Sequence, residues 1–321
     1  MAKPRIYVTR RMPDRVLSEL RESFEVGYHD SEGPLAREQI LRRVAGVDGC
    51  VLTLSDRADA ELFDAAGPNL RIAANYAVGV DNLDIPAATE RGVVVTNTPD
   101  VLTDATAEFA IALMLSTMRR VAEGDRFLRA RRTWSWSPTM MLGNSPRART
   151  LGVVGFGRIG QEVARLGSCL GMRVIFSDSM ERHVPGSEQV TLPQLLGRSD
   201  VVSLHCPLLP ETHHLIGEEE LRAMKPSAYL INTSRGPVVD EAALEHALRI
   251  GEIAGAGLDV FEHEPQVAAN LLDLDNVVLA PHLASATHDT RDAMGFLCVS
   301  ALRTVLLEGA IPANALNTKT H

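Results

Sequence analysis

A glycine-rich turn lies almost halfway along the 321-residue chain. The stretch LGVVGFGRIGQEVA, residues 151–164, spaces Gly155, Gly157 and Gly160 as G-x-G-x-x-G between an apolar strand pattern and a helical pattern. In a parallel α/β sheet, such glycines permit a tight turn, the approach of backbone N–H groups to a pyrophosphate, and close packing of helix on strand. The helix N-terminus also favours phosphate charge. The turn therefore predicts a dinucleotide site, and a glycine-rich packing turn is the alternative.

An acidic residue ends the next predicted strand. The stretch RVIFSD ends on Asp178, 18 residues after Gly160. A carboxylate here can accept hydrogen bonds from the adenosine ribose hydroxyls and would repel a 2′-phosphate. We therefore predict NAD as the cofactor and leave NADP open, because Arg182 lies nearby in the sequence. The alternative for Asp178 is a solvated acid at a strand end.

Strand and helix patterns alternate both before and after the glycine turn, which predicts parallel sheets with helices on their faces. A last helical pattern, residues 289–309, follows the nucleotide unit and can return to the first one. We therefore expect an α/β fold of two Rossmann-like or flavodoxin-like parallel-sheet domains. The nucleotide domain, 102–287, would be inserted within the other domain, which is formed by 1–101 and 288–321. The expected strands cover residues 5–9, 24–28, 50–54, 70–76, 93–97, 151–156, 173–178, 201–206, 228–233, 254–260 and 276–282.

A long helical pattern rich in Ala and Leu covers residues 104–130. Residues 131–150 then break the pattern with two prolines and both tryptophans of the chain. We expect this irregular segment to form a projecting arm or loop.

Charge and composition exclude several classes of function. The chain has 41 acidic and 32 basic residues, a net charge of −9 and no basic tract, so we expect no nucleic-acid partner. It has no apolar run long enough to span a bilayer and no N-terminal signal-peptide pattern, so we expect no membrane partner. The four cysteines are scattered without a CxxC pair, so we predict no metal site and a reducing, cytoplasmic setting.

Polar side chains follow three apolar strands in the second half of the chain. AYLINT leads to Arg235, AGAGLDV leads through Asp259 to Glu264, and NVVLAPH ends on His282. Ligands of open α/β sheets bind outside the carboxyl ends of the strands, so we expect these groups to meet there. Taken singly, Arg235 could be a surface salt-bridge partner, Glu264 a loop acid, and His282 a hydrogen-bonded core histidine.

Together these side chains suit the reduction of a carbonyl by hydride. A histidine that titrates near neutral pH can supply the proton that the developing alkoxide needs, and an adjacent carboxylate stabilises the protonated ring. An arginine can hold a substrate carboxylate through two parallel hydrogen bonds and polarise the neighbouring carbonyl. The pattern therefore predicts interconversion of 2-oxo and 2-hydroxy acids.

The chain resembles the D-isomer-specific 2-hydroxyacid dehydrogenases over nearly its whole length. Seven motifs occur in the family's order: NYAVGVDNLD (75–84), NTPDVLTDATAE (97–108), GFGRIG (155–160), HCPLLPETHHLI (205–216), INTSRGPVVDE (231–241), GLDVFEHEP (257–265) and APHLASAT (280–287).

The resemblance implies a role for each matching residue. Arg235 would bind and orient the substrate, Glu264 would pair with the acid–base His282, and the backbone N–H groups of Val78 and Gly79 would hold the substrate carboxylate. Asp259 would contact the nicotinamide amide, and Cys206 would line the dinucleotide groove unless it is a plain core cysteine. The full cofactor-binding set would be Thr106, Gly155, Gly157, Arg158, Ile159, Gly160, Asp178, Cys206, Pro207, Thr212, Thr233 and Asp259.

Within the family, WSPTMMLG (136–143) resembles the glyoxylate/hydroxypyruvate reductase branch. In that branch a tryptophan of the partner subunit reaches the active site and limits substrate size, and Trp136 matches it in its W-x-P setting. The resemblance thus implies a homodimer with 131–150 as the dimerisation arm, although Trp136 could instead only fill the interface. The chain departs from the usual pattern at NSPRART (144–150), at Ala284 in place of a common glycine, and at Asp178 and Ser179, where NADP-dependent members often carry an arginine.

The predicted function is the NAD(P)H-dependent reduction of a small 2-oxo acid, glyoxylate or hydroxypyruvate, to the D-2-hydroxy acid. Two alternatives stay open. One is another D-2-hydroxyacid dehydrogenase that acts on a D-lactate-like or branched substrate. The other is a dinucleotide-sensing binding protein on the same fold.

Overall fold

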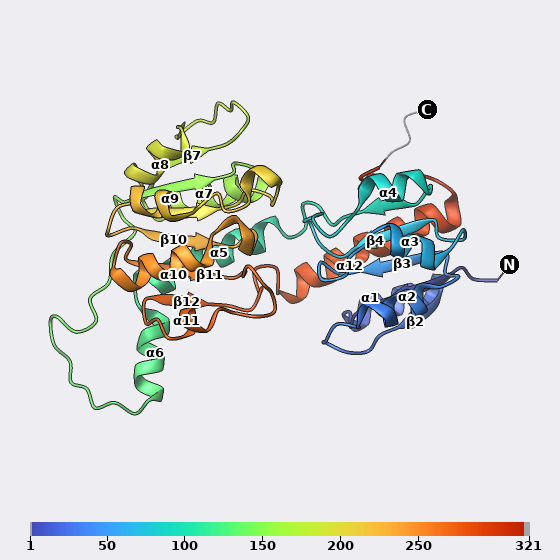
Figure 1. The fold of residues 1–321 in the computed structure, drawn as a ribbon, viewed down its shortest axis with the longest axis horizontal. Coiled ribbons are helices and arrows are strands. Elements are labelled where there is room, and N and C mark those ends of the chain that lie inside the picture. The colour runs from blue at the N-terminus through green and yellow to red at the C-terminus, as the bar shows by residue number, and fades with distance from the viewer. Residues whose placement is uncertain (1, 318–321) are drawn as a thin grey trace. The chain divides into compact units, whose positions relative to one another are not determined.

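The computed structural model describes residues 2–317, and they form two compact units (Figure 1). Unit 1 contains the described residues up to Leu102 and from Ala286 onward. Unit 2 contains Thr103–Ser285 and is therefore an insertion in the sequence of unit 1. Among the described residues, we find no helix that combines the length and the apolar character needed to cross a bilayer.

Unit 1 is a five-stranded parallel sheet in the order β2-β1-β3-β4-β5, with helices packed against it. Gly49 of β3 lets the last helix approach, because a Cβ atom there would lie 2.9 Å from Leu302 and 3.2 Å from Leu306. The chain's C-terminal part thus completes the core of its N-terminal part. The elements are β1 (Arg5–Val8), α1 (Asp14–Ser23), β2 (Glu25–Tyr28), α2 (Arg37–Val44), β3 (Gly49–Leu52), α3 (Ala60–Ala66), β4 (Ile72–Asn75), α4 (Ile85–Glu90), β5 (Val94–Thr96), α12 (His288–Arg303) and the π-helical turn η3 (Thr304–Glu308).

Unit 2 is a seven-stranded parallel sheet in the order β12-β11-β10-β9-β6-β7-β8. Its central strands are almost wholly buried on both faces, as expected for a parallel sheet covered by helices. The elements are α5 (Thr103–Met118), α6 (Val121–Arg129), β6 (Thr150–Val154), α7 (Arg158–Cys169), β7 (Arg173–Ser177), β8 (Ser187–Gln189), α8 (Leu192–Arg198), β9 (Val201–Leu204), η1 (Pro210–Thr212), α9 (Glu218–Ala223), β10 (Tyr229–Asn232), η2 (Gly236–Val238), α10 (Glu241–Ile250), β11 (Gly255–Leu258), α11 (Ala269–Leu272) and β12 (Val277–Leu279). The predicted fold class, two parallel-sheet α/β domains, is confirmed.

The single helix predicted over 104–130 is wrong, because the structure divides it into α5 and α6. Arg120 interrupts the helix with a left-handed φ of 56°, and its guanidinium forms an ion pair with Glu123 in the first turn of α6. The returning chain packs against the end of α5, where Asn144 donates its backbone N–H to the Met118 carbonyl at 2.8 Å. The apolar pattern of residues 104–130 does not indicate this break.

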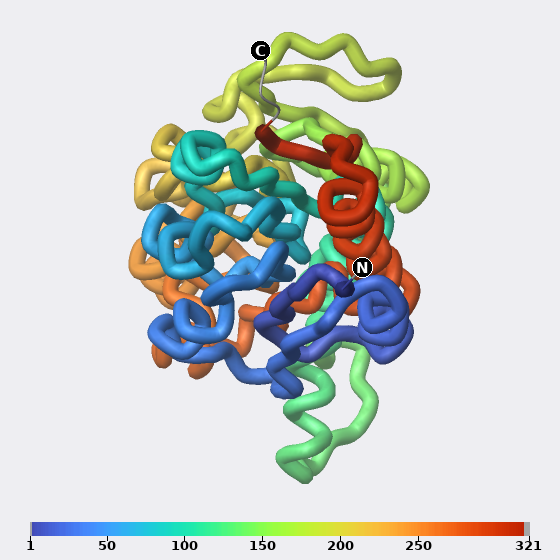
Figure 2. Tube along the Cα trace, turned by 90° about the vertical axis from the view of Figure 1, so that its right-hand side faces the viewer, coloured from blue at the N-terminus to red at the C-terminus, as the bar shows by residue number. Residues whose placement is uncertain are grey.

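The arm, which we define as α6 and residues 130–143, projects from the sheet of unit 2 in both views (Figures 1 and 2). Trp134 and Trp136 lie on it with exposed fractions of 56% and 79%. The projecting segment predicted for 131–150 is therefore present, and it exposes large apolar side chains rather than burying them.

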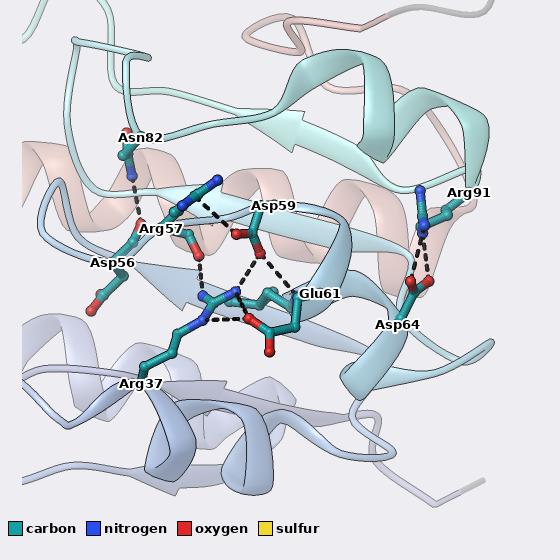
Figure 3. A network of polar contacts seen from close by, with 9 residues as sticks. Arg37, Asp56, Arg57, Asp59, Glu61, Asp64, Asn82 and Arg91 are labelled. Carbon is teal, nitrogen blue, oxygen red and sulfur yellow. Dashed lines mark hydrogen bonds and ion pairs between the residues drawn. The ribbon is translucent and has the colours of Figure 1, made fainter.

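A polar network fixes the loops at one end of the unit 1 sheet (Figure 3). Arg37 binds the carboxylates of Asp59 and Glu61, while Asn82 donates to the backbone carbonyls of Thr53 (3.2 Å) and Asp56 (3.0 Å). These contacts join the loop after β3 to the loop after β4, which contains the predicted substrate-binding residues.

Candidate active site

The glycine turn between β6 and α7 has the local geometry that a pyrophosphate needs. Gly155 has a φ of 85°, and a Cβ atom there would lie 2.6 Å from the backbone nitrogen of Cys206. A Cβ at Gly160 would lie 2.2 Å from the Gly155 carbonyl oxygen, whereas one at Gly157 would meet nothing within 4 Å. Packing within unit 2 therefore requires glycine at positions 155 and 160. The middle one faces open space at the N-terminus of α7, which fits a bound dinucleotide.

Asp178 follows β7 and holds the glycine turn in place. Its carboxylate accepts hydrogen bonds from the backbone N–H groups of Phe156 at 2.7 Å and Met180 at 2.9 Å, and Arg182 Nε lies 3.5 Å away. Burial raises the pKa of this carboxyl, but the two N–H donors and Arg182 outweigh burial and leave the pKa lowered. Asp178 is thus an anion at the predicted ribose position. Its side chain is only 10% exposed, so the alternative of a solvated acid is wrong.

One buried hydroxyl near the strand ends has no partner among the described residues. Thr233 follows β10 directly, and its Oγ1 is buried without a hydrogen bond. An unsatisfied buried polar atom is costly, so such an atom is typical of a position that a ligand or water completes. Thr233 therefore fits its predicted place in the cofactor-binding set.

The remaining predicted cofactor residues lie on the same unit. Thr106 is buried in α5, and Arg158 and Ile159 open α7. Burial raises the pKa of the Cys206 thiol to about 11, so this cysteine is a neutral buried group. The Thr212 hydroxyl donates to the Pro207 carbonyl at 2.7 Å and thereby shapes the turn after β9.

Arg235 lies in the loop after β10, and Asn232 builds that loop. The Asn232 amide donates to the Arg235 carbonyl at 2.9 Å, and its oxygen accepts from the Ser234 N–H at 3.0 Å. A Cβ atom at Gly236 would lie 1.9 Å from the Phe261 carbonyl carbon, so the Arg235 loop touches the backbone of the loop after β11. Sequence reasoning missed Asn232, although an Asn that precedes a turn is a known signal.

His282 and Glu264 form the centre of the site. His282 Nδ1 lies 2.9 Å from Glu264 Oε2, and the other Glu264 oxygen accepts the Phe261 backbone N–H at 3.1 Å. Burial raises the pKa of the Glu264 carboxyl, but His282, the Phe261 N–H and the charge of Arg235 outweigh burial and leave the pKa lowered. The structure thus brings the predicted acid and histidine into direct contact, within the electrostatic range of the predicted arginine.

Asp259 holds the backbone of the loop that carries His282. Its carboxylate is fully buried and accepts the backbone N–H groups of Leu283 at 2.6 Å and Ala284 at 2.8 Å, while its own carbonyl accepts the His282 N–H at 2.8 Å. These bonds hold His282 at a left-handed φ of 55°, which a non-glycine residue adopts only when its surroundings impose it. Direct support of the histidine loop is a function of Asp259 that the sequence did not indicate. Its predicted nicotinamide contact stays a prediction.

The Val78–Gly79 loop of unit 1 has a defined orientation. Three successive carbonyls, of Ala77, Val78 and Gly79, accept hydrogen bonds from Thr98 N (2.9 Å), Asn97 Nδ2 (2.8 Å) and Asn75 Nδ2 (2.9 Å). The N–H and C=O of one peptide group point in opposite directions, so the N–H groups of Val78, Gly79 and Val80 point away from these donors. Adjacent amides with this orientation suit a carboxylate ligand.

A parallel sheet with a phosphate-type glycine turn, and a histidine–carboxylate pair outside its strand ends, define a dinucleotide-dependent oxidoreductase. The family model described as "D-isomer specific 2-hydroxyacid dehydrogenase, NAD binding domain" matches residues 111–284. The chain belongs to this family and is an NAD(P)-dependent enzyme.

Similar proteins support the family assignment along the whole chain. The glyoxylate reductase of Korarchaeum cryptofilum is 52% identical over 98% of this chain and 96% of its own. The glyoxylate reductase of Thermococcus onnurineus is 48% identical with the same coverage. The structure of an NADPH-dependent glyoxylate/hydroxypyruvate reductase from Sinorhizobium meliloti, in complex with NADP and malonate, superposes with a TM-score of 0.86 at 37% identity, covering 98% of this chain and 97% of that one.

Proposed function

We propose that this protein reduces glyoxylate or hydroxypyruvate to the D-2-hydroxy acid. The observation that carries the proposal is the 2.9 Å contact of His282 with Glu264 on the unit that holds the glycine turn. The whole-chain similarity to glyoxylate reductases supports the choice of substrate.

The side chains of this site would act on the carboxylate and on the carbonyl group of the substrate. Bound NAD(P)H supplies the hydride. Arg235 would bind the substrate carboxylate and polarise the carbonyl beside it. His282 Nδ1 is engaged by Glu264, so Nε2 is the atom that would donate the proton to the carbonyl oxygen. Glu264 would stabilise the protonated ring before the transfer and orient it throughout.

The backbone N–H groups of Val78, Gly79 and Val80 would bind a substrate carboxylate from unit 1. The carbonyl oxygens of these peptide groups already accept hydrogen bonds from other residues of unit 1. The orientation of the N–H groups is therefore set without a ligand. We accordingly assign these backbone contacts with the substrate to unit 1, while Arg235, His282 and the cofactor-binding residues belong to unit 2.

Gly157 and the N-terminus of α7 would hold the pyrophosphate, and Asp178 would face the adenosine ribose. We propose a preference for NAD, because the Asp178 carboxylate is ionised and would repel a 2′-phosphate. Arg182 lies beside Asp178, and its positive charge would attract a 2′-phosphate and so reduce the preference for NAD.

We also propose a cytoplasmic homodimer that forms through the arm. Trp134 and Trp136 are too exposed for the interior of one chain, and large exposed aromatic side chains are typical of interface anchors. Trp136 would then limit substrate size in the partner's site. Analytical ultracentrifugation of the wild type and of Trp134→Ala should show a shift from dimer towards monomer, and an unchanged dimer would exclude the arm as its main contact.

A steady-state panel tests the proposed reaction. The enzyme is assayed with glyoxylate, hydroxypyruvate, pyruvate and bulkier 2-oxo acids, each with NADH and with NADPH. We expect the highest kcat/KM for glyoxylate or hydroxypyruvate with NADH, and a gain on bulkier acids in Trp136→Ala. A protein that binds NADH but turns over none of these acids would fit the dinucleotide sensor, and a preference for pyruvate or branched acids would favour the other dehydrogenase.

A further inference from the structure

A second group of histidines and a carboxylate lies on unit 2 and shares no residue with the proposed catalytic set. The ligating atoms of His213, His214 and Glu262 all lie within 4.8 Å of one another. His214 Nε2 is 2.8 Å from Glu262 Oε1, and the rings of His213 and His214 stack with centroids 4.1 Å apart. His213 is exposed, so the group is open to solvent.

The backbone presents this group in a fixed arrangement. His214 has a left-handed φ of 51° and donates its N–H to the Pro237 carbonyl at 2.8 Å, beside the bridge that pairs Ile216 with Val239. The backbone N–H of Glu262 is bound by the buried Glu241 side chain at the start of α10. Two separate segments, after η1 and after β11, thus deliver their side chains to one point, and the conformation of His214 is one that its surroundings impose.

The groups behind these side chains have the pattern found at metal centres. A ligating histidine usually places its second ring nitrogen against a carboxylate, and His214 Nδ1 lies 3.9 Å from Asp240 Oδ2. The second oxygen of Glu262 faces the backbone N–H of Glu241 at 3.4 Å, which leaves Oε1 for the shared point. Asp240 and Glu241 thus lie on the far sides of His214 and Glu262, while His214 Nε2 and Glu262 Oε1 face each other.

We propose that His213, His214 and Glu262 bind a divalent transition metal of the Zn²⁺ type. Two imidazoles and one carboxylate are ligands that Zn²⁺ accepts, and water would complete a four-coordinate site. Metal–nitrogen bonds are about 2.0–2.1 Å long, so the exposed His213 ring must swing slightly inward to close the site. With a metal on Nε2, the neutral His214 ring would carry its single ring proton on Nδ1, on the side of Asp240. Nitrogen ligands also select against Mg²⁺.

Isothermal titration of the EDTA-treated full-length enzyme with ZnCl₂ tests the proposal. We expect one Zn²⁺ equivalent in the wild type, at least tenfold weaker binding at this site in His213→Ala and in Glu262→Gln, and no heat from MgCl₂. His246→Ala, which removes an exposed histidine of α10 outside the cluster, is the matched control and should bind as the wild type does. Zn²⁺ should raise the Tm of the wild type more than that of His213→Ala.

The result that overturns the proposal is equal Zn²⁺ affinity in the wild type and His213→Ala, or no Zn²⁺ binding by the wild type. His213 is an exposed side chain, so its removal leaves a folded protein even if the Glu262→Gln variant disturbs its loop. Neither outcome depends on the identity of the oxo acid.

Discussion

Two histidines of unit 2 follow parallel strands at the same edge of one sheet and differ in what their rings meet. His205 follows β9, and its Nε2 lies 2.8 Å from the Ser203 hydroxyl. Burial lowers the pKa of His205 to about 3, so its ring is neutral at physiological pH. His282 follows β12 and meets the Glu264 carboxylate. Location at a strand end therefore does not make an acid–base group, because burial keeps the His205 ring neutral, whereas His282 is paired with a carboxylate that can orient it.

Replacement of His282 should have the largest effect. We expect His282→Ala to lower kcat for glyoxylate reduction by about 10²–10⁴-fold, because the variant lacks the group that we assign as the proton donor. NADH binding, measured by fluorescence titration, should be nearly unchanged. Near-normal turnover would contradict the acid–base assignment and remove the functional difference between the two histidines.

Replacement of Glu264 should have a smaller effect that depends on pH. Glu264→Gln removes the charge that stabilises the ring when it carries the proton, so kcat should fall, and the fall should be larger at pH 8 than at pH 6. We expect a loss of about tenfold at pH 8, measured as kcat for glyoxylate reduction at saturating NADH.

The pH–rate profile of the wild type is the reference for this variant. Because the pKa of Glu264 is lowered, its carboxylate stays ionised into mildly acidic solution and the pair persists there. A uniform loss at every pH would show that Glu264 only positions the ring.

Replacement of His205 should leave kcat at saturating NADH largely intact and change the pH dependence of stability. The folded pKa of His205, about 3, lies below the unfolded value of 6.5, so the unfolded chain binds more protons between these values. The resulting stability is fully present above pH 6.5 and is lost as the pH falls towards 3. Urea unfolding from pH 4.5 to 6.5 should be less steeply pH-dependent in His205→Gln, by up to about 1.4 kcal/mol per pH unit. Parallel stability curves would mean that His205 is not held neutral by the fold.

Much of the fold followed from the sequence, because two local signals were strong. Apolar runs bounded by turn residues marked the central strands, and the glycine spacing located β6 and α7. The short α4, α8 and β8 were not predicted, since three to seven residues carry too little periodicity. The break at Arg120 depends on a tertiary contact with the returning chain, which no local pattern encodes.

The catalytic residues were predicted from their places at strand ends and from the family resemblance, but their supports were not. Asn232 binds the Arg235 carbonyl within its own turn. Asp259 and Glu241 instead bind backbone groups 24 and 21 positions away in sequence. Such partners become visible only when the chain has folded. The same holds for the pairing of His214 with Glu262, which are 48 positions apart.

The missing side chain at Gly236 has a consequence for anyone who wishes to redesign this enzyme. Because position 236 has no Cβ atom, the backbone next to Arg235 can lie directly against the backbone of Phe261, in the loop that leads to Glu264. Any larger residue at position 236 would push these two loops apart and move Arg235 and Glu264 out of place. Libraries aimed at new substrates should therefore leave position 236 untouched and diversify the arm or the loop around residue 80.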